Sequence, residues 1–192
     1  MISKSYGERT AFRLAGIALS VALATPACGD DDKKSTDGKQ STLCNAKTLE
    51  ADLDASPFMG PAVNPQTGEL TMEPGASYVV SSTYGVPKPG SDGAPFTDRY
   101  LEVFSAIQEA LGKQPGLLAI KLASSESCAS GRTLAIWSSE DEMYDFVVGE
   151  AHLTAMKEAK DLLQPGFAVT HWAANSAAQA SWEHAIKQLA SD

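Results

Sequence analysis

The chain has 192 residues, and its 15 Lys and Arg residues against 24 Asp and Glu residues give a formal net charge of −9. This length suits one domain with a core of its own. The acidic balance, with no basic cluster to offset it, argues against nucleic acid as a partner, because such a surface repels phosphate backbones.

The first 27 residues have the outline of a secretory signal peptide. Basic residues up to Arg13 precede an apolar stretch from Leu14 to Ala24, and small residues then lead to Cys28. A membrane-spanning helix needs roughly 20 apolar residues, so this shorter stretch predicts cleavage of residues 1–27 and not a permanent span. Cleavage removes three basic residues and one acidic residue, which leaves 12 basic and 23 acidic residues and a net charge near −11.

The residues that end at Cys28 resemble a bacterial lipobox, at which a cysteine receives fatty acids such as palmitate. The alternative is ordinary signal cleavage, which leaves Cys28 as a free thiol. Lipidation leaves Cys44 and Cys128 as an even pair, which can form a disulfide in an oxidising compartment, whereas the alternative for this pair is two free thiols. The prediction is an extracytoplasmic protein, lipid-anchored to a bacterial membrane. Gly29 after Cys28 is compatible with delivery to an outer membrane.

Two segments separate the predicted anchor from the predicted domain. Residues 28–41 form a lipidated tether, because the stretch after Cys28 has no apolar residue and its composition is typical of disorder. As a flexible coil, a tether of this length reaches roughly 20 Å. Residues 42–76 contain four Pro and three Gly, which predicts an irregular arm with a short helix near Leu49 to Leu53. A bond between Cys44 and Cys128 would clip this arm to the domain.

Residues 77–192 show regular periodicities and form the predicted domain. β-branched and aromatic residues mark the first strand, Thr97 precedes an apolar stripe at helical spacing, and Ser139 with Glu142 forms a capping box. The predicted elements are strands over 77–84, 117–123, 133–137 and 167–173, and helices over 97–111, from 139 to the turn at 165–166 with an interruption at 149, and over 182–189. Their order predicts an α+β fold, a ferredoxin-like βαββαβ sandwich with a C-terminal helix.

Short segments spread over residues 77–182 carry a family resemblance. They are Thr133-Leu134-Ala135-Ile136-Trp137-Ser138-Ser139, Phe146, Ala151-His152, Ala155-Met156, His171-Trp172 and Ser181-Trp182-Glu183. These segments resemble the antibiotic biosynthesis monooxygenase superfamily, whose members are dimeric α/β barrels. The resemblance implies a homodimer in which two sheets close face to face and leave a small cavity between each sheet and its loops.

Haem-degrading members of that superfamily use an Asn on the first strand and a Trp and a His in the helical segment after the third strand. The strand over 77–84 has no Asn, and Phe146 and about Met156 stand where the Trp and His would lie. Haem degradation is therefore not expected.

The faces of the second predicted strand bear on the homodimer. Alternation places Leu118, Ile120 and Leu122 on one side and Leu117, Ala119, Lys121 and Ala123 on the other, so both faces are largely apolar. Helices cover one face, and the other, with Ala135 and Trp137, is expected to be bare unless a second copy covers it. The alternative is that the arm folds over this face within one chain and makes a monomer, filled by Phe58, Met59 and Leu70.

The candidate site residues are few. His152 and His171 are the candidate catalytic residues, since a neutral imidazole can take a proton near pH 7, and packing is the alternative for both. Tyr84, Lys121 and Trp137 are the candidate ligand-pocket residues, with core packing or, for the lysine, a rim position as the alternative.

Neither a metal nor a cofactor is predicted, because the three histidines are widely spaced and no Cys-x-x-Cys motif is present. Two functions stay open. One is a cofactor-independent oxygenase of a small organic substrate. The other is a non-catalytic lipoprotein of the same fold, which binds a small molecule or has a structural role.

Overall fold

The structure is a computed structural model that describes residues 44–73, 75–91 and 93–191. The predicted signal peptide, Cys28 and the tether lie outside these residues. Among the residues that are described, no helix is both long and apolar enough to cross a membrane.

The described chain forms a five-stranded antiparallel sheet in the order β1-β3-β4-β2-β5. The strands are β1 (Asp54–Ala55), β2 (Tyr78–Gly85), β3 (Leu117–Ser125), β4 (Ser130–Trp137) and β5 (Ala168–Ala174). The interior strand β2 pairs with β4 and β5, which come later in the chain. This connectivity confirms the predicted α+β, ferredoxin-like class.

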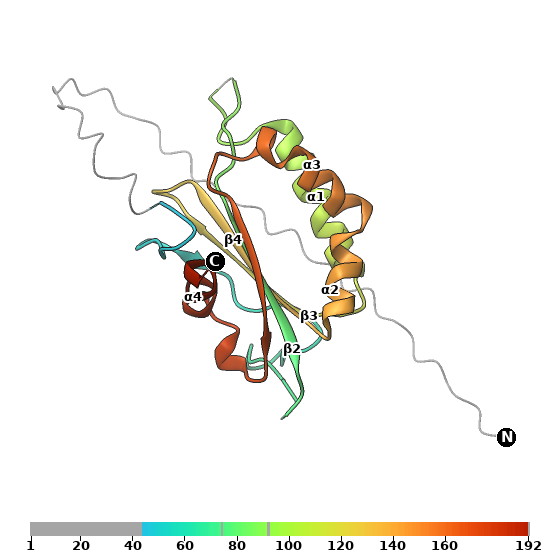
Figure 1. Cartoon of the computed structure of the whole chain (residues 1–192). Helices are drawn as coiled ribbons and strands as arrows, with labels where there is room; N and C mark the ends of the chain where they lie inside the picture. Colours follow the sequence, from blue (N-terminus) through green and yellow to red (C-terminus); the bar gives the residue numbers. More distant parts are fainter. Residues whose placement is uncertain (1–43, 74, 92, 192) are drawn as a thin grey trace.

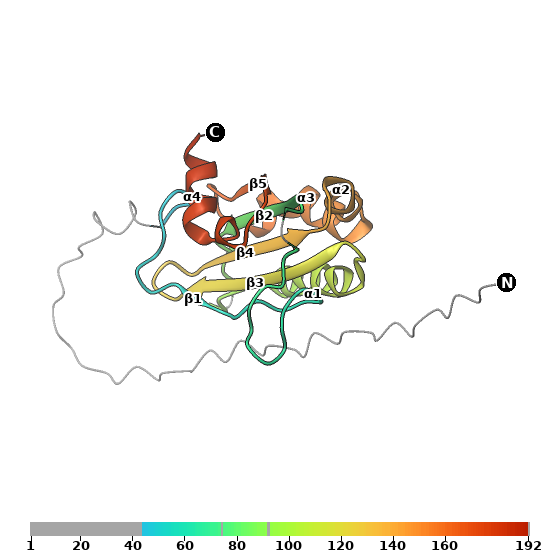
Figure 2. The same ribbon diagram turned by 90° about the horizontal axis from the view of Figure 1, so that it is seen from below.

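Helices lie on both faces of the sheet. α1 (Asp98–Lys113), α2 (Glu140–Val147) and α3 (Glu150–Leu162) cover one face, and α4 (Trp182–Ser191) lies against the other, after a 3-10 turn at Ala177–Gln179 (Figures 1 and 2). The predicted caps are present. The hydroxyl of Thr97 accepts from the Tyr100 amide at 3.0 Å, and the hydroxyl of Ser139 accepts from the Glu142 amide at 3.2 Å.

The arm differs from its prediction. Residues 49–53 form turns and not a short helix, because the backbone groups of the arm find partners at the edge of β3 instead. Met59 and Ile120 exchange two backbone hydrogen bonds of 2.8 Å, and the amide of Ser56 donates to the Leu122 carbonyl at 2.8 Å. The arm therefore extends the sheet and covers an edge that would otherwise be open to association.

A close approach of backbones fixes where the arm meets β3. A Cβ on Gly60, whose φ is +143°, would lie 2.5 Å from the Leu118 carbonyl oxygen and 2.8 Å from the Ala119 Cα. Only glycine fits this conformation and this contact without strain. The pairing of β3 with β4 shifts register between Leu117 and Ala119 at the same point.

The sheet face that was expected to be bare is covered by the same chain, so that expectation is wrong. Residues of the arm and of α4 pack on it, namely Leu49, Leu53, Phe58, Val63, Leu70, Met72, Trp182 and Ala185. Their strand partners include Val80, Leu134, Ile136 and Trp172. The alternative of an intrachain cover is the one that the structure shows. The predicted homodimer is not tested by this single chain, and it loses its argument from a bare face.

Some side chains lie on the opposite face from the one predicted. Leu117, Ala135 and Trp137 face the helices, where they pack with Met143 and Phe146. The register shift turns Leu117 over, because one extra residue in a strand reverses the alternation on one side of it. Ile120 and Leu122 face the helices as well, and Ala119 and Ala123 face the arm, as their alternation predicted.

Candidate functional site

The five candidate side chains lie in separate parts of the domain. Trp137 and His152 lie on the helix side of the sheet, and His171 lies on the edge strand β5. Lys121 lies under the arm, and Tyr84 lies beside the disulfide. No single pocket among the described residues brings the predicted catalytic and ligand residues together, and their roles stay predictions.

Trp137 and His152 both contact the ring of Phe146, which is tilted against each of them. The ring centroid of Phe146 lies 5.4 Å from that of Trp137 and 5.0 Å from that of His152. The Trp137 indole donates to the Ser81 hydroxyl at 2.8 Å, and Nδ1 of His152 lies 3.1 Å from the Val147 carbonyl oxygen. Burial lowers the pKa of His152, against an opposing effect of that hydrogen bond. The imidazole is therefore neutral near pH 7 and links the end of α2 to α3.

His171 is the more exposed of the two candidate bases. Its side chain is 45% exposed, its ring centroid lies 6.1 Å from that of Tyr144 on α2, and its Nε2 lies 3.8 Å from a Glu140 carboxylate oxygen. These contacts connect the edge strand β5 with the first turns of α2. They place a titratable group on an open surface and not in a cavity.

Lys121 projects from β3 between two aromatic rings that belong to different segments. Its Nζ lies 4.8 Å from the ring centroid of Phe58 in the arm and 5.0 Å from that of Trp182 in α4. Burial lowers the pKa of this ammonium group, and the Glu183 charge opposes that shift. Cation–π contacts of this kind stabilise a partly buried charge. Lys121 therefore ties the arm to α4 across the sheet.

Tyr84 lines a cavity of about 250 Å³ whose other walls come from the start of the arm, the β3–β4 turn and the turn before β5. These walls are Cys44, Asn45, Val86, Cys128, Gln164, Pro165 and Gly166. The Tyr84 hydroxyl is buried and has no hydrogen-bond partner among the residues described here. Burial, followed by the Glu50 charge, raises the pKa of this phenol. The group therefore stays protonated and available to donate.

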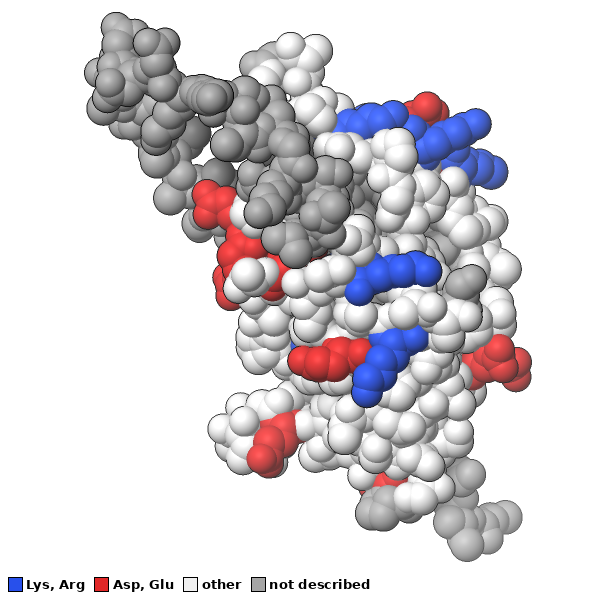
Figure 3. Space-filling view, turned by 60° about the vertical axis from the view of Figure 1, so that its left-hand side comes forward, with Lys and Arg blue, Asp and Glu red and all other residues white. Residues whose placement is uncertain are grey.

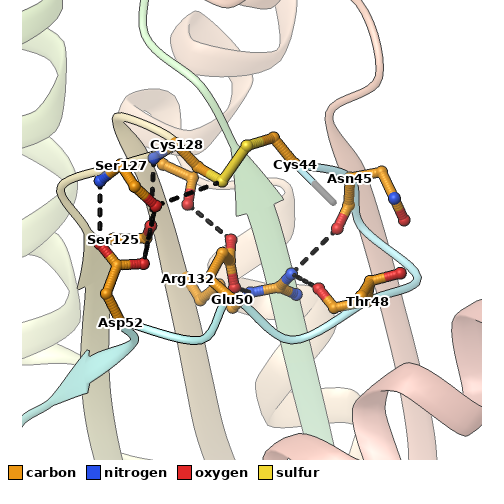
Figure 4. The surroundings of a disulfide bond; sticks show 10 residues. Cys44, Asn45, Thr48, Glu50, Asp52, Ser125, Ser127, Cys128 and Arg132 are labelled. Atoms are coloured by element: carbon orange, nitrogen blue, oxygen red, sulfur yellow. Dashed lines mark hydrogen bonds and ion pairs between the residues drawn. A yellow bond between two sulfur atoms is a disulfide. The ribbon is translucent and has the colours of Figure 1, made fainter. Parts of the chain in front are cut away.

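The disulfide between Cys44 and Cys128 (Figure 4) confirms the predicted pairing. Both cysteines line this cavity. An ion pair lies beside the disulfide. Arg132 Nε donates to the Glu50 carboxylate at 2.9 Å, and both side chains are at most 1% exposed. The guanidinium also donates to the carbonyls of Asn45, Ala46 and Thr48, and it lies 4.5 Å from the ring centroid of Tyr84.

This ion pair was missed by the sequence analysis. Glu50 lies in a segment without periodicity, and Arg132 precedes the predicted third strand by one residue. The two are 82 residues apart in the chain, and no local pattern links positions at such a separation. The one available signal is the predicted disulfide, since a bond from Cys128 to Cys44 brings the two segments together.

A second hollow, of about 530 Å³, lies between α1 and α3, and the sequence analysis did not predict it. Its charged lining includes Arg99, Glu102, Glu109 and Lys113, and these charges pair with one another or with Glu158. Glu150 also lines this surface groove, so most but not all of its charges are paired. Among the described residues, no group of three His, Cys, Asp or Glu side chains could hold a metal ion.

Comparison with known proteins gives a likeness of fold. No family model matches the chain, and no curated protein does. A putative monooxygenase from Fusobacterium nucleatum is similar with a TM-score of 0.43 and 12% identity over 62% of this chain, and the match spans 48% of the length of that protein. SnoaB, a cofactor-independent oxygenase from Streptomyces nogalater, is similar with a TM-score of 0.38 and 13% identity over 53% of this chain and 93% of SnoaB.

An antibiotic biosynthesis monooxygenase is similar with a TM-score of 0.41 and 13% identity over 49% of this chain and 95% of that protein. The solved structures found in this way thus include a protein named for the superfamily that the sequence segments resemble. At these identities and TM-scores the likeness concerns the arrangement of strands and helices, and it carries no argument about activity.

Proposed function

We propose that the protein is a lipid-anchored extracytoplasmic domain that binds a small polar molecule in the Tyr84 cavity. The observation that carries this proposal is the buried Tyr84 hydroxyl, which has no partner among the described residues although it belongs to a cavity-lining side chain. A buried polar group without a hydrogen bond costs about 1–3 kcal/mol. A ligand that accepts from this hydroxyl recovers that cost on binding, and it needs a small shift of the cavity wall to do so because the oxygen is buried.

The cavity limits the chemistry of the ligand. Its volume of about 250 Å³ suits a molecule of few heavy atoms, since drug-sized ligands occupy pockets of roughly 300–1,000 Å³. The protonated Tyr84 supplies a donor. Gln164 and Gly166 also line the cavity, although the Gln164 side-chain amide already donates to the Pro87 carbonyl at 3.4 Å. Val86 and Pro165 supply apolar contact. A small carboxylate or amide fits this combination.

The disulfide supports the extracytoplasmic location, because such bonds persist in oxidising compartments. Lipidation of Cys28 is still a prediction, based on the signal-peptide sequence that precedes this residue. Metabolic labelling with a tagged fatty acid tests it: the wild-type protein is expected to carry label, and Cys28→Ala is expected to carry none. Label retained in that variant would contradict the anchor.

We also infer that the domain works as a monomer. The arm and α4 bury the apolar face that a second copy was expected to cover, and Lys121 holds these two segments together. Sedimentation of the mature protein at micromolar concentrations is expected to give the mass of one chain. A dimer at these concentrations would contradict the inference.

Ligand-detected NMR with acetate and acetamide as probes tests the cavity. The matched control is Tyr84→Phe, which keeps the ring over Arg132 and removes only the hydroxyl. Loss of one hydrogen bond worth about 1 kcal/mol is expected to weaken binding about fivefold. Equal affinity of the two proteins would remove the assigned role of Tyr84.

A second candidate, a cofactor-independent oxygenase, is favoured by the ring contacts that link Trp137 through Phe146 to the neutral, half-buried His152. Such an enzyme uses a base to ionise an easily oxidised substrate, and a neutral imidazole can take that proton. Oxygen uptake with a panel of phenols, abolished in His152→Ala, would support this function. No uptake by the wild-type protein would leave the binding function alone.

A further inference from the structure

At one end of the domain, the start of the described chain lies near two loops that hydrogen-bond to each other, one after β2 and one before β5. Cys44 lines the same cavity as Pro165 and Gly166. Next to them, the amide of Gln164 donates to the Val86 carbonyl at 2.8 Å, and the amide of Lys88 donates to the Leu162 carbonyl at 2.8 Å. We define residues 86–88 and 160–169, together with Cys44, as the tether end.

The tether end exposes large apolar side chains. Phe167 is 44% exposed and Val169 is 62% exposed. Val169 lies on the edge strand β5, on the side opposite the buried Thr170 and Trp172. Exposed apolar groups that gather at one place mark contact surfaces. Phe167 and Val169 therefore give this end of the molecule an exposed apolar surface that can contact a partner.

Basic side chains lie beside these apolar groups. Nζ of Lys88 donates to the backbone carbonyl of Lys160 at 2.6 Å, which brings the two lysines together at the end of α3. Figure 3 shows Lys and Arg side chains gathered at the upper end of the molecule, the end at which α3 stops in Figure 1. In a chain with a net charge of −9, such a basic group is a local exception.

The segment between Cys28 and Cys44 limits how far the domain can lie from the predicted lipid anchor. Cys28 and Cys44 are 16 residues apart, so even a fully extended chain between them spans at most about 55 Å. The domain is thus held close to whatever carries Cys28, and the chain enters at the tether end. The tether end is therefore the part of the domain that the anchor holds nearest along the chain.

We propose that the tether end docks onto the bilayer that holds the lipid anchor. Phe167 and Val169 enter the headgroup region, and Lys88 and Lys160 contact anionic headgroups. The proposal rests on the proposed lipidation of Cys28. Docking in this way fixes the orientation of the domain and sets the Tyr84 cavity beside the membrane, since Pro165 and Gly166 line that cavity directly before Phe167.

The experiment places a fluorescent reporter at the docking surface of the full lipidated protein. Phe167→Trp is reconstituted in vesicles of phosphatidylglycerol and phosphatidylethanolamine in equal amounts, with and without brominated acyl chains. The native Trp137, Trp172 and Trp182 are buried and give a constant background. The matched control is Tyr144→Trp, at an aromatic position of similar exposure on α2.

The expected result is a blue shift and bromolipid quenching of the Phe167→Trp emission, with the Tyr144→Trp signal unchanged. Lys88→Glu combined with Lys160→Glu is expected to reduce the quenching, and so are vesicles of phosphatidylcholine alone. A protein that floats with the vesicles but shows no quenching at position 167 overturns the docking and leaves the anchor intact. A protein that carries no fatty-acid label and does not float overturns the anchor, and the docking with it.

Discussion

The two faces of the sheet are held in different ways. The arm face is closed by links between segments far apart in the chain, namely the Cys44–Cys128 disulfide, the buried Glu50–Arg132 pair and the contacts of Lys121. The helix face is covered by α1 and α2, which begin at the side-chain caps Thr97 and Ser139, and by α3, which begins at Gly149 without such a cap. Few residues of α1 and α3 are fully buried. The arm has almost no regular secondary structure of its own, so contacts between residues far apart in the chain hold it on the sheet.

The largest effect is expected for Arg132→Ala on the arm face. The change leaves the Glu50 carboxylate buried without its partner and removes donors to three backbone carbonyls. Breaking a buried pair in this way destabilises a protein by about 3–5 kcal/mol. Urea unfolding measures the loss. Arg99→Ala is the control, since its ion pairs are exposed, and a similar loss in both variants would contradict the distinction between buried and exposed pairs.

Removal of the disulfide is expected to have the next largest effect. Changing Cys44 and Cys128 to Ser frees a loop with a sequence separation of 84 residues, and the expected loss of stability is about 2–4 kcal/mol. Denaturant unfolding of the double variant measures it, and the wild-type protein in excess reductant should unfold at the same midpoint. Two alkylatable thiols in the mature oxidised protein would contradict the bond itself.

A cap on the helix face is expected to matter less. Ser139→Ala removes the hydroxyl that accepts from the Glu142 amide, and such a loss costs about 1 kcal/mol. Ser139→Gly is the matched control, because glycine at this position costs only a few tenths of a kcal/mol. Equal urea midpoints for the two variants would show that the hydrogen bond of the cap contributes little.

The smallest expected effect is a dependence on pH through His152. Burial holds its folded pKa below the ordinary value of 6.5, so the unfolded chain takes up the proton first. Stability is therefore lost as the pH falls through 6.5 toward the lower folded pKa. The urea midpoint of the wild-type protein should fall more steeply over this range than that of His152→Gln.

Asp52 also has a displaced pKa, but it does not titrate in the pH range of this test. Hydrogen bonds from Ser125 and Ser127 lower the pKa of Asp52 from 3.8 to about 2, so its contribution to stability is lost only between these two values. Identical profiles for the wild-type protein and His152→Gln above pH 5 would contradict the displaced pKa of His152.

The sequence identified single candidate residues, but it did not predict which of them lie together. Tyr84 was expected in a pocket and lines one, but the sequence placed it with Trp137 and Lys121, which lie on opposite sides of the sheet. A side chain's face in a strand follows from alternation only while the register is regular, and the shift near Leu117 breaks that rule. The partners of Tyr84 come from segments that no local pattern connects.

The sequence alone determined the order of elements from β2 to α4, because hydrophobic periodicity and capping residues are local signals. It also predicted the bond between Cys44 and Cys128, because lipidation of Cys28 would leave only these two cysteines, whereas the alternative of two free thiols was excluded only by the structure. Only the tertiary structure decided what covers the second face of the sheet. The arm has no period of its own, and its backbone is ordered by the edge of β3, by the close contact of Gly60 with Leu118, and by a salt bridge to Arg132. These are long-range contacts, and their free energy appears only when both segments are in place.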